Sequence, residues 1–235
     1  MTENYIVNEG KNEIIEVGGQ KYSRFGLKTH VITDQDKIID VAKEYALPYL
    51  QPGDTLFITE KIVACTQKRA IPIKDIHPRP LAKFLSKFVR RTPYGIGLAM
   101  PETMEMALRE CGTLRILLAS AVSAVGKIFG IRGWFYNIAG YRARSIDGPC
   151  EYTLPPYNHY VVLGPDRPDE VAKEIADAIG YPVAITDIND LEGQVLGVSD
   201  KKTMDKKELA LILKDNPLGQ SHEQTPMGII RPVSE

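Results

Sequence analysis

The sequence predicts an α/β fold of mixed α/β and α+β character, because strand-like segments alternate with amphipathic helices. One such unit has a strand beginning at 160, a helix over 168–179 and a second strand over 181–186. In that helix Val171, Ile175 and Ile179 recur at i, i+4 and i+8 and therefore share one face. At about 30 residues, the strand–helix–strand unit (160–187) has the size of a βαβ crossover.

The other elements follow from the same spacing rules. Residues 5–25 predict only edge strands, and apolar residues at helical spacing predict a helix over 37–49. Residues 55–59 predict a buried strand, and a second apolar stretch follows at 62–65. Further helices are expected at 80–91, 101–110 and 205–214. Residues 113–147 are rich in small residues and glycine, and their elements stay unassigned.

The composition limits the partners and the compartment. A formal net charge of −1 over 235 residues gives no overall electrostatic attraction to nucleic acid or to a membrane surface, so neither is expected as a partner. Three cysteines without C-x-x-C spacing argue against a disulfide framework or a zinc site. The N-terminus is polar and lacks a signal peptide, which predicts a cytoplasmic protein.

Two apolar or basic segments have plain structural interpretations. The longest apolar run, 116–125, is too short to span a bilayer and is expected to be a buried core segment. The basic helix at 80–91 is expected to turn its lysines and arginines to solvent. It lacks the interleaved stacking aromatics of a nucleic-acid patch.

The acidic turn at 187–190 is the first candidate for chemistry. Asp187, Asn189 and Asp190 place three oxygen-bearing side chains directly after a buried strand, where open α/β sheets bind their ligands. Clustered carboxylates repel one another unless a cation compensates them, so Mg²⁺ or Mn²⁺ is the natural occupant. The alternative is an ordinary turn, since Asp and Asn are common turn residues.

Asp147 is the second candidate, because it follows Arg142 and Arg144 and precedes a Gly-Pro turn. An aspartate beside phosphate-binding arginines suits a metal–nucleotide site, and a structural Asp-Gly-Pro turn is the alternative. Lys61, just past the strand at 55–59, can meet a phosphate or form a surface salt bridge with Glu60.

The polar loop at 215–226 is the third candidate, because functional residues concentrate on loops that rigid elements hold. As a binding loop it offers Gln220 and Ser221 to a nucleotide, and Glu223 as a catalytic base. A solvated connection is the alternative. The chain contains neither a P-loop nor a G-x-G-x-x-G fingerprint, so no familiar motif decides between them.

The order of these features resembles the γ-glutamyl ligases of deazaflavin coenzyme F420. The resemblance rests on Leu27-Lys-Thr, on Gly53-Asp54-x-Leu-x-Ile-Thr-x-Lys61-Ile-Val, on the aspartate at 147 and on Thr186-Asp187. It covers residues 27–231, which predicts an N-terminal extension at 1–26 and a ligase-like domain at 27–235. A boundary between lobes, if the domain has one, is expected near 145–160.

The resemblance implies an unusual α/β fold, a homodimer, and amide formation between a deazaflavin derivative and glutamate with GTP and Mn²⁺ or Mg²⁺. It carries over Asp187 and Asp147 as metal ligands and Lys61 beside the phosphates. The chain departs from the family at Ser145-Ile-Asp147-Gly-Pro, where the family has Gly-Val-Asp-x-Ser-Asn. It departs again after Asp187, where Ile-Asn-Asp replaces a Ser/Thr and an Arg-bearing segment.

The leading hypothesis is a GTP- or ATP-dependent ligase that joins an amino acid to a small carboxylate or phosphorylated metabolite through an acyl phosphate. Asp147, Asp187 and Asp190 would hold the metal, and Asp190 or Glu223 would act as the base. Lys61, Arg142, Arg144, Gln220 and Ser221 would contact the nucleotide. A nucleotide- or metabolite-binding module without catalysis is the alternative, and a hydrolytic or phosphoryl-transfer enzyme is a third.

Overall fold

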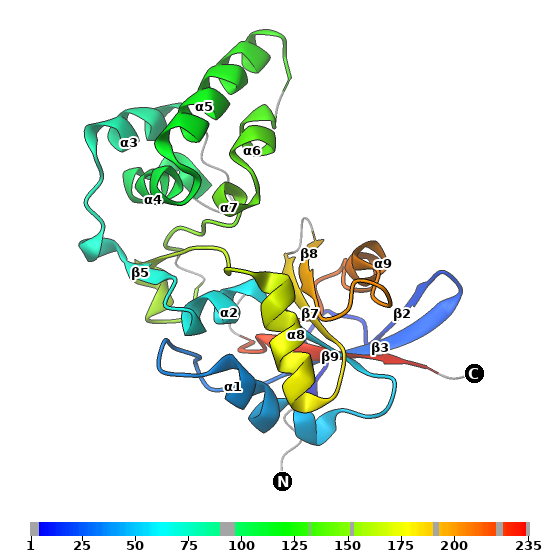
Figure 1. Ribbon diagram of the computed structural model, residues 1–235. Coiled ribbons are helices and arrows are strands. Elements are labelled where there is room, and N and C mark those ends of the chain that lie inside the picture. The colour runs from blue at the N-terminus through cyan, green and yellow to red at the C-terminus, as the bar shows by residue number, and fades with distance from the viewer. Residues whose placement is uncertain are drawn as a thin grey trace. The chain divides into compact units, whose positions relative to one another are not determined.

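A mixed seven-stranded sheet organises the first of two compact units in this computed structural model (Figure 1). The structure describes residues 5–89, 97–131, 133–150, 153–189, 193–219 and 223–233. The first unit comprises Met1–Lys68 and Pro165–Glu235, and the second comprises Arg69–Gly164. The predicted α/β fold class is confirmed, whereas the assignment of 1–26 and 27–235 as separate regions stays a prediction.

The sheet of the first unit has the order β1-β3-β9-β4-β7-β8, with β2 paired to β3. Its strands are β1 (Tyr5–Ile6), β2 (Ile14–Val17), β3 (Gln20–Leu27), β4 (Thr55–Thr59), β7 (Val183–Ile188), β8 (Gly193–Val198) and β9 (Met227–Pro232). Only β4 and β7 are parallel neighbours among these pairs, and the others are antiparallel. Residues 5–27 thus supply three strands of the sheet.

Helices cover both faces of this sheet. They are α1 (Ile38–Tyr45), α2 (Glu60–Thr66), α8 (Pro168–Ile179) and α9 (Lys206–Ile212). Phe57, Ala184 and Ile230 turn to the face that α9 covers, where they join Leu209 and Ile212 in one buried cluster. On the other face α8 packs against β7, β8 and α1. Gly197 of β8 is required for this contact, because a Cβ there would lie 2.3 Å from the backbone of Pro168.

Several predicted elements are confirmed, and three need correction. The helix at 168–179 has the predicted bounds, and the apolar stretch at 62–65 belongs to α2, where all four residues are buried. The strand–helix–strand order also holds. However, β6 (Tyr160–Val162) pairs with β5 (Ala70–Pro72), so the unit is not a crossover within one sheet. The reason is that Val161 and Leu163 pack into the core of the second unit.

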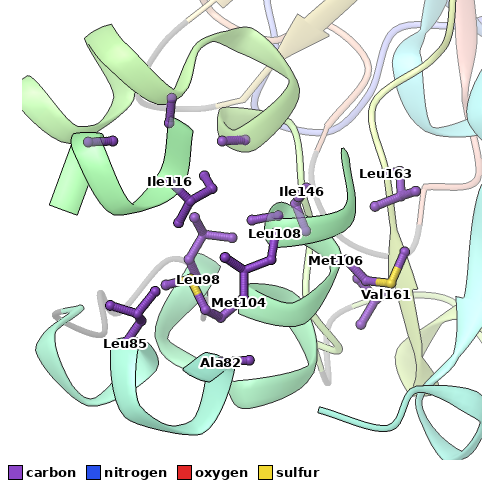
Figure 2. Close-up of a cluster of buried hydrophobic side chains, with 14 of the residues drawn as sticks. Ala82, Leu85, Leu98, Met104, Met106, Leu108, Ile116, Ile146, Val161 and Leu163 are labelled. Atoms are coloured by element: carbon purple, nitrogen blue, oxygen red, sulfur yellow. The ribbon is translucent and has the colours of Figure 1, made fainter. Parts of the chain in front are cut away.

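The second unit is largely helical. Its helices are α3 (Pro80–Leu85), α4 (Pro101–Cys111), α5 (Thr113–Ile128), α6 (Trp134–Ala139) and α7 (Tyr141–Arg144). Figure 2 shows Leu98, Met104 and Leu108 near Ile116 of α5, and Met106 beside Val161 of β6. All of them belong to one buried cluster. The predicted helix at 101–110 is confirmed, and Gly112 ends it with a φ of 84°, which a residue with a side chain rarely adopts.

The apolar run at 116–125 is not a buried core segment, and this prediction is wrong. Ile116 and Ala119 are buried, but Leu118 is 58% and Val125 is 50% exposed. Hydrophobicity alone does not show which face of a helix is covered, and α5 turns only one face to the core. Within the described residues, a single helix of sufficient length and apolarity to cross a bilayer does not occur. The bent pair α4–α5 meets that test only when both helices are counted together.

The predicted basic helix is also shorter than expected, and its exposed side chains are less polar than expected. It covers 80–85 as α3 and continues over Ser86–Phe88 as a 3₁₀ turn, while Arg90 and Arg91 lie outside the described residues. Lys83 and Lys87 are exposed, as predicted, but so are Phe84 (58%) and Phe88 (61%).

A buried carboxylate ties α3 to α4 in the second unit. Glu105 is 1% exposed and accepts hydrogen bonds from Arg79 Nε (3.0 Å), the Arg79 backbone N–H (3.1 Å) and Arg109 Nε (2.9 Å). Burial alone would raise the pKa of Glu105, but the hydrogen bonds from Arg79 and Arg109 outweigh it and hold the pKa below its usual value. The ionised form of Glu105 therefore stabilises the folded state.

We expect Glu105 to contribute to acid sensitivity. A carboxyl group with a lowered pKa stabilises the fold above its unfolded pKa of about 4.3, and this contribution disappears as the pH falls through the folded pKa. In urea unfolding, the wild type should therefore lose more stability between about pH 6 and about pH 3 than Glu105→Gln does. Glu174→Gln, at an exposed position of α8, is the control. Equal losses for wild type and Glu105→Gln would contradict the prediction.

Candidate active site

The first unit brings several strand ends together at one end of its sheet. Thr59 of β4 is paired with Thr186 of the parallel strand β7, and Ile58 is paired with Met227, the first residue of β9. Leu27, the last residue of β3, is also paired with Met227. We call this end, marked by Leu27, Thr59, Thr186 and Met227, the carboxyl end of the sheet. Ligands of open α/β sheets bind at such an end.

Lys61 lies at this end, in the first turn of α2. Thr59 is the last residue of β4, its backbone N–H donates to the carbonyl oxygen of Pro226 (2.9 Å), and α2 begins at the next residue. The buried residues Ile62, Val63, Ala64 and Cys65 fix the helix, so Glu60 and Lys61 are half-buried at its start. The local sequence therefore places the positively charged side chain of Lys61 just beyond the end of a central strand.

Asp187 lies at the same end, one residue beyond Thr186. Thr186 is buried and donates a hydrogen bond from Oγ1 to the carbonyl oxygen of Ile58 (3.3 Å), which ties the two strand ends together. Asp187 and Asn189 are half-buried, and Asp187 is paired with Gln194 of β8. Asp190, the third predicted oxygen donor, lies outside the described residues.

The described part of the loop at 215–226 is anchored, which distinguishes it from a loosely solvated connection. Asn8 donates from Nδ2 to Thr225 Oγ1 (2.9 Å) and to the Pro217 carbonyl oxygen (3.0 Å), and Thr225 donates to the Leu218 carbonyl oxygen (2.7 Å). Arg24, 1% exposed, forms an ion pair with Asp215 at the start of the loop.

Glu223 is held in the same loop. Its side chain folds over Gly219, since a Cβ on that glycine would lie 2.5 Å from Glu223 Cδ. Glu223 precedes β9 and so lies at the carboxyl end of the sheet. Its contact with Gly219 gives its side chain a defined position. Gln220 and Ser221 lie outside the described residues.

His30 is a residue at this end that the sequence did not single out. It follows β3, and its Nδ1 lies 2.8 Å from Tyr45 Oη while its Nε2 lies 3.1 Å from Asp36 Oδ1. Asp36 is half-buried; burial opposes ionisation, but hydrogen bonds from Thr33 and His30 outweigh it and lower the pKa of Asp36. Burial raises the pKa of Tyr45. The proximity of Leu27-Lys-Thr, a segment of the resemblance, was the clue that could have identified His30.

The second unit holds the remaining predicted residues. The backbone N–H and C=O of Asp147 both bond to Val162 of β6 (2.8 and 2.9 Å), so an exposed carboxylate stands on a fixed backbone. Arg142 lies 3.6 Å from Glu110, which also binds Arg69 at 2.6 Å. The Arg144 guanidinium lies 5.9 Å from the ring centre of Tyr136. The predicted residues Arg142, Arg144 and Asp147 thus lie within one short stretch of the second unit.

The oxygen donors at the carboxyl end are of the kind that a hard divalent cation prefers, but the described ones do not by themselves form a metal-binding cluster. Asp187, Asn189, Glu60 and Glu223 are all oxygen donors, which Mg²⁺ and Mn²⁺ prefer. Within the described ranges, no group of three or more His, Cys, Asp or Glu side chains is close enough to hold a metal. Asp190 lies beyond those ranges.

A family model described as F420-0:Gamma-glutamyl ligase matches residues 26–189, more than two thirds of the chain. The chain belongs to this family. A search of curated proteins found no match. The family membership implies a ligase and confirms the resemblance seen in the sequence.

The part matched to the F420-0:γ-glutamyl ligase family contains some predicted site residues and not others. Lys61, Arg142, Arg144, Asp147 and Asp187 lie inside it. Glu223, Asp190, Gln220 and Ser221 lie outside it. Within the first unit, the fold of this chain brings Lys61 and Asp187, from the matched part, and Glu223, from outside it, to one end of the sheet.

Proposed function

We propose that the chain is a metal- and nucleotide-dependent amide ligase of the γ-glutamyl type. It would join an amino acid to a small carboxylate or phosphorylated metabolite, with GTP or ATP as cosubstrate. The observation that carries the proposal is the pairing of Thr59 with Thr186, which places Lys61 and Asp187 at the ends of adjacent parallel strands. A cation and an acidic oxygen donor so placed suit phosphoryl transfer.

Asp187 is the first proposed metal ligand, with Asp147 and Asp190 as further ligands. When bound, Mg²⁺ or Mn²⁺ supplies neutralisation of charge at the nucleotide's phosphates. The half-buried position of Asp187 on a strand end limits its movement, so the residue offers a preorganised oxygen donor.

The cationic side chains orient the phosphates in this proposal. Lys61 places its ammonium at the terminal phosphate, while Arg142 and Arg144 of the second unit contact the nucleotide, as do Gln220 and Ser221. An oxygen of the acceptor carboxylate bonds to the terminal phosphorus, and the nucleoside diphosphate leaves. The product is an acyl phosphate.

Amide formation completes the reaction. The amine nitrogen bonds to the acyl carbon, phosphate leaves, and a carboxylate takes the proton from the nitrogen. Glu223 and Asp190 are the proposed bases. Glu223 is held over Gly219 at the carboxyl end of the sheet, so its carboxylate has a defined position.

Phosphate release and calorimetry together test the proposal. With Mn²⁺ and GTP or ATP, we expect phosphate release that requires both a carboxylate acceptor and an amino acid, with one amide formed per phosphate. Titration should show nucleotide binding that depends on Mn²⁺. Steady release without an amine would instead indicate a hydrolytic or phosphoryl-transfer enzyme.

A binding module without catalysis is the second candidate. The observation that favours it is that two exposed arginines of the second unit already have partners there, with Arg142 3.6 Å from Glu110 and the Arg144 guanidinium 5.9 Å from the ring centre of Tyr136. The chain also departs from the family pattern around Asp147. Nucleotide binding without phosphate release, across a panel of acids and amines, would support this function over the ligase.

A further inference from the structure

Three side chains that follow β3 form a continuous hydrogen-bonded array in the first unit. His30 Nε2 lies 3.1 Å from Asp36 Oδ1, and His30 Nδ1 lies 2.8 Å from Tyr45 Oη. The imidazole therefore bridges a carboxylate and a hydroxyl group. We call Asp36, His30 and Tyr45 the His30 array. A base that contacts a hydroxyl and is itself oriented by a third group is the arrangement by which enzymes activate a hydroxyl.

The Asp36 carboxylate is fixed at its other oxygen as well. Asp36 Oδ2 accepts hydrogen bonds from the Thr33 backbone N–H (2.7 Å) and from Thr33 Oγ1 (3.1 Å). Burial opposes ionisation, but these bonds and the one from His30 outweigh it and lower the pKa of Asp36. The turn at 33–36 therefore holds an ionised carboxylate in one position against the imidazole.

The ionised state of Asp36 determines the tautomer of His30. A carboxylate only accepts hydrogen bonds, so in the neutral imidazole we assign the proton to Nε2 and leave Nδ1 as an acceptor. The Tyr45 hydroxyl then donates to Nδ1. Imidazole is the side chain that gains and loses a proton near neutral pH, and a neighbouring carboxylate stabilises its charged form. The array can therefore take up a proton that reaches the Tyr45 hydroxyl.

The His30 array lies at the carboxyl end of the sheet, beside the loop that carries Glu223. The Thr29 backbone N–H donates to the carbonyl oxygen of Gln224 (3.3 Å), and Gln224 Nε2 donates to the carbonyl oxygen of Thr29 (2.9 Å). Each of these two residues is the immediate chain neighbour of a candidate, His30 on one segment and Glu223 on the other. Hydrogen bonds thus join the segment of the array to the segment of the proposed base.

The array is accessible to a ligand and to water. The side chains of His30 and Asp36 are 45% and 24% exposed, and Tyr45 is half-buried. The exposed residue Glu44 is a second acceptor for the Tyr45 hydroxyl, so His30, Asp36 and Glu44 are the titratable groups that act on it. A proton held by the imidazole can therefore leave to solvent.

An amide ligase has to remove two protons from its amine. An amino acid is mostly an ammonium ion at neutral pH and has no lone pair for attack. One proton leaves before the nitrogen bonds to the acyl carbon, and the other leaves afterwards. A carboxylate such as Glu223 suits the second step, because the nitrogen is strongly acidic once it has bonded to carbon. The first step needs a base that is matched to neutral pH, and imidazole is such a base.

We propose, on the basis of the ligase function proposed above, that the His30 array takes the first proton from the amine. The Tyr45 hydroxyl oxygen accepts a proton from the ammonium group, and the proton of the hydroxyl passes to His30 Nδ1. The nitrogen keeps the electron pair of the broken N–H bond and becomes the nucleophile. The array gains one positive charge, which Asp36 stabilises, and water then takes the proton from the imidazolium.

Hydroxylamine separates this step from the rest of the reaction. It is uncharged at neutral pH, so it attacks an acyl phosphate without first losing a proton, and the product is a hydroxamate. With the full chain, Mn²⁺, GTP or ATP and a panel of small acids, Tyr45→Phe and His30→Gln should form hydroxamate at close to the wild-type rate. With L-glutamate in place of hydroxylamine, amide formation by both variants should fall by about a hundredfold or more.

The pH dependence of amide formation is a readout that a purely structural role would not change. In His30→Gln the shortfall should shrink as the pH rises, because free amine then forms without a base. Two variants serve as controls and should keep both rates. Asp34→Asn changes an exposed carboxylate outside the array, and Tyr181→Phe removes a hydroxyl that donates to the Leu50 carbonyl oxygen. Unfolding midpoints show whether each variant folds.

Nitrogen-15 NMR of the imidazole tests the array without any substrate. The signals of His30 are assigned by their absence in His30→Gln. Neutral His30 should carry its proton on Nε2, and Asp36→Asn should weaken that preference. A proton on Nδ1 of neutral His30 in the wild type would overturn the relay.

The kinetic measurements can overturn the relay in two further ways. Equal losses of hydroxamate and amide in folded Tyr45→Phe and His30→Gln would show that the array only supports the structure. Full amide formation by folded Tyr45→Phe would show that the amine loses its proton elsewhere. The absence of hydroxamate from the wild type across the acid panel is a different result, because it would overturn the ligase itself and the relay with it.

Discussion

In Asp187→Ala, nucleotide turnover should fall by roughly a thousandfold, because the ion at the phosphates contributes several kcal/mol of charge stabilisation. Asp187 stands one residue beyond Thr186, whose hydroxyl is hydrogen-bonded to the end of β4. The truncation therefore removes an oxygen donor and leaves both strand ends in place. Phosphate release with saturating Mn²⁺ and nucleotide measures the loss.

The control for this variant is Asp200→Ala. Asp200 follows β8, the neighbour of β7, and lies near the opposite end of the sheet, since Val198 is paired with Ala184. Its replacement should leave turnover unchanged. Metal-dependent nucleotide binding, measured by calorimetry, should weaken in Asp187→Ala and persist in Asp200→Ala. Full turnover by folded Asp187→Ala would remove Asp187 from the metal site.

The parts of the fold that the sequence predicts are those decided locally. The helix at 168–179 follows from one apolar face and from the proline and glycine at its ends, and its bounds are as expected. The partner of β6 could not be predicted, because a three-residue strand carries little pairing information. Its neighbour is chosen by the packing of Val161 and Leu163 in the second unit.

In the candidate site, too, the local features could be predicted from the sequence and the long-range ones could not. Asp187 and Lys61 could each be identified from their position after a strand, but their proximity depends on the parallel pairing of β4 with β7. Residues 60–182 separate these strands, so the pairing is not a local property. His30 was missed for a different reason: its partners Asp36 and Tyr45 lie in the following turn and helix, but the three residues form no recognisable motif in the sequence.

Asp54 belongs to the Gly53-Asp54 step that carried much of the resemblance, and its surroundings indicate a structural role. It is fully buried and accepts hydrogen bonds from Arg231 Nε (2.9 Å), Arg231 Nη2 (2.7 Å) and the Gln51 backbone N–H (2.8 Å). Hydrogen bonds with Asp54 raise the pKa of Arg231, whose guanidinium also lies 5.2 Å from the ring centre of Phe25. The pair therefore joins the turn before β4 to β9.

Asp54→Ala should cost about 3 kcal/mol of unfolding free energy in urea titration. The value is at the lower end for a broken buried pair, because Arg231 is 29% exposed and can regain some water. Asp177→Ala breaks the exposed Lys173–Asp177 pair and should cost less than about 0.5 kcal/mol.

A double-mutant cycle measures the interaction free energy between Asp54 and Arg231 separately from the contribution of each residue alone. Arg231→Met leaves the carboxylate of Asp54 buried without its guanidinium, so it should be at least as costly as Asp54→Ala. The double variant should then be less destabilised than the sum of the two single variants, because neither charge remains buried alone. Additive losses would show that Asp54 and Arg231 act independently. If the losses are coupled and Asp54→Ala keeps its catalytic turnover at low temperature, the Gly53-Asp54 step is a structural connection that positions β4, and Lys61 after it carries the chemistry.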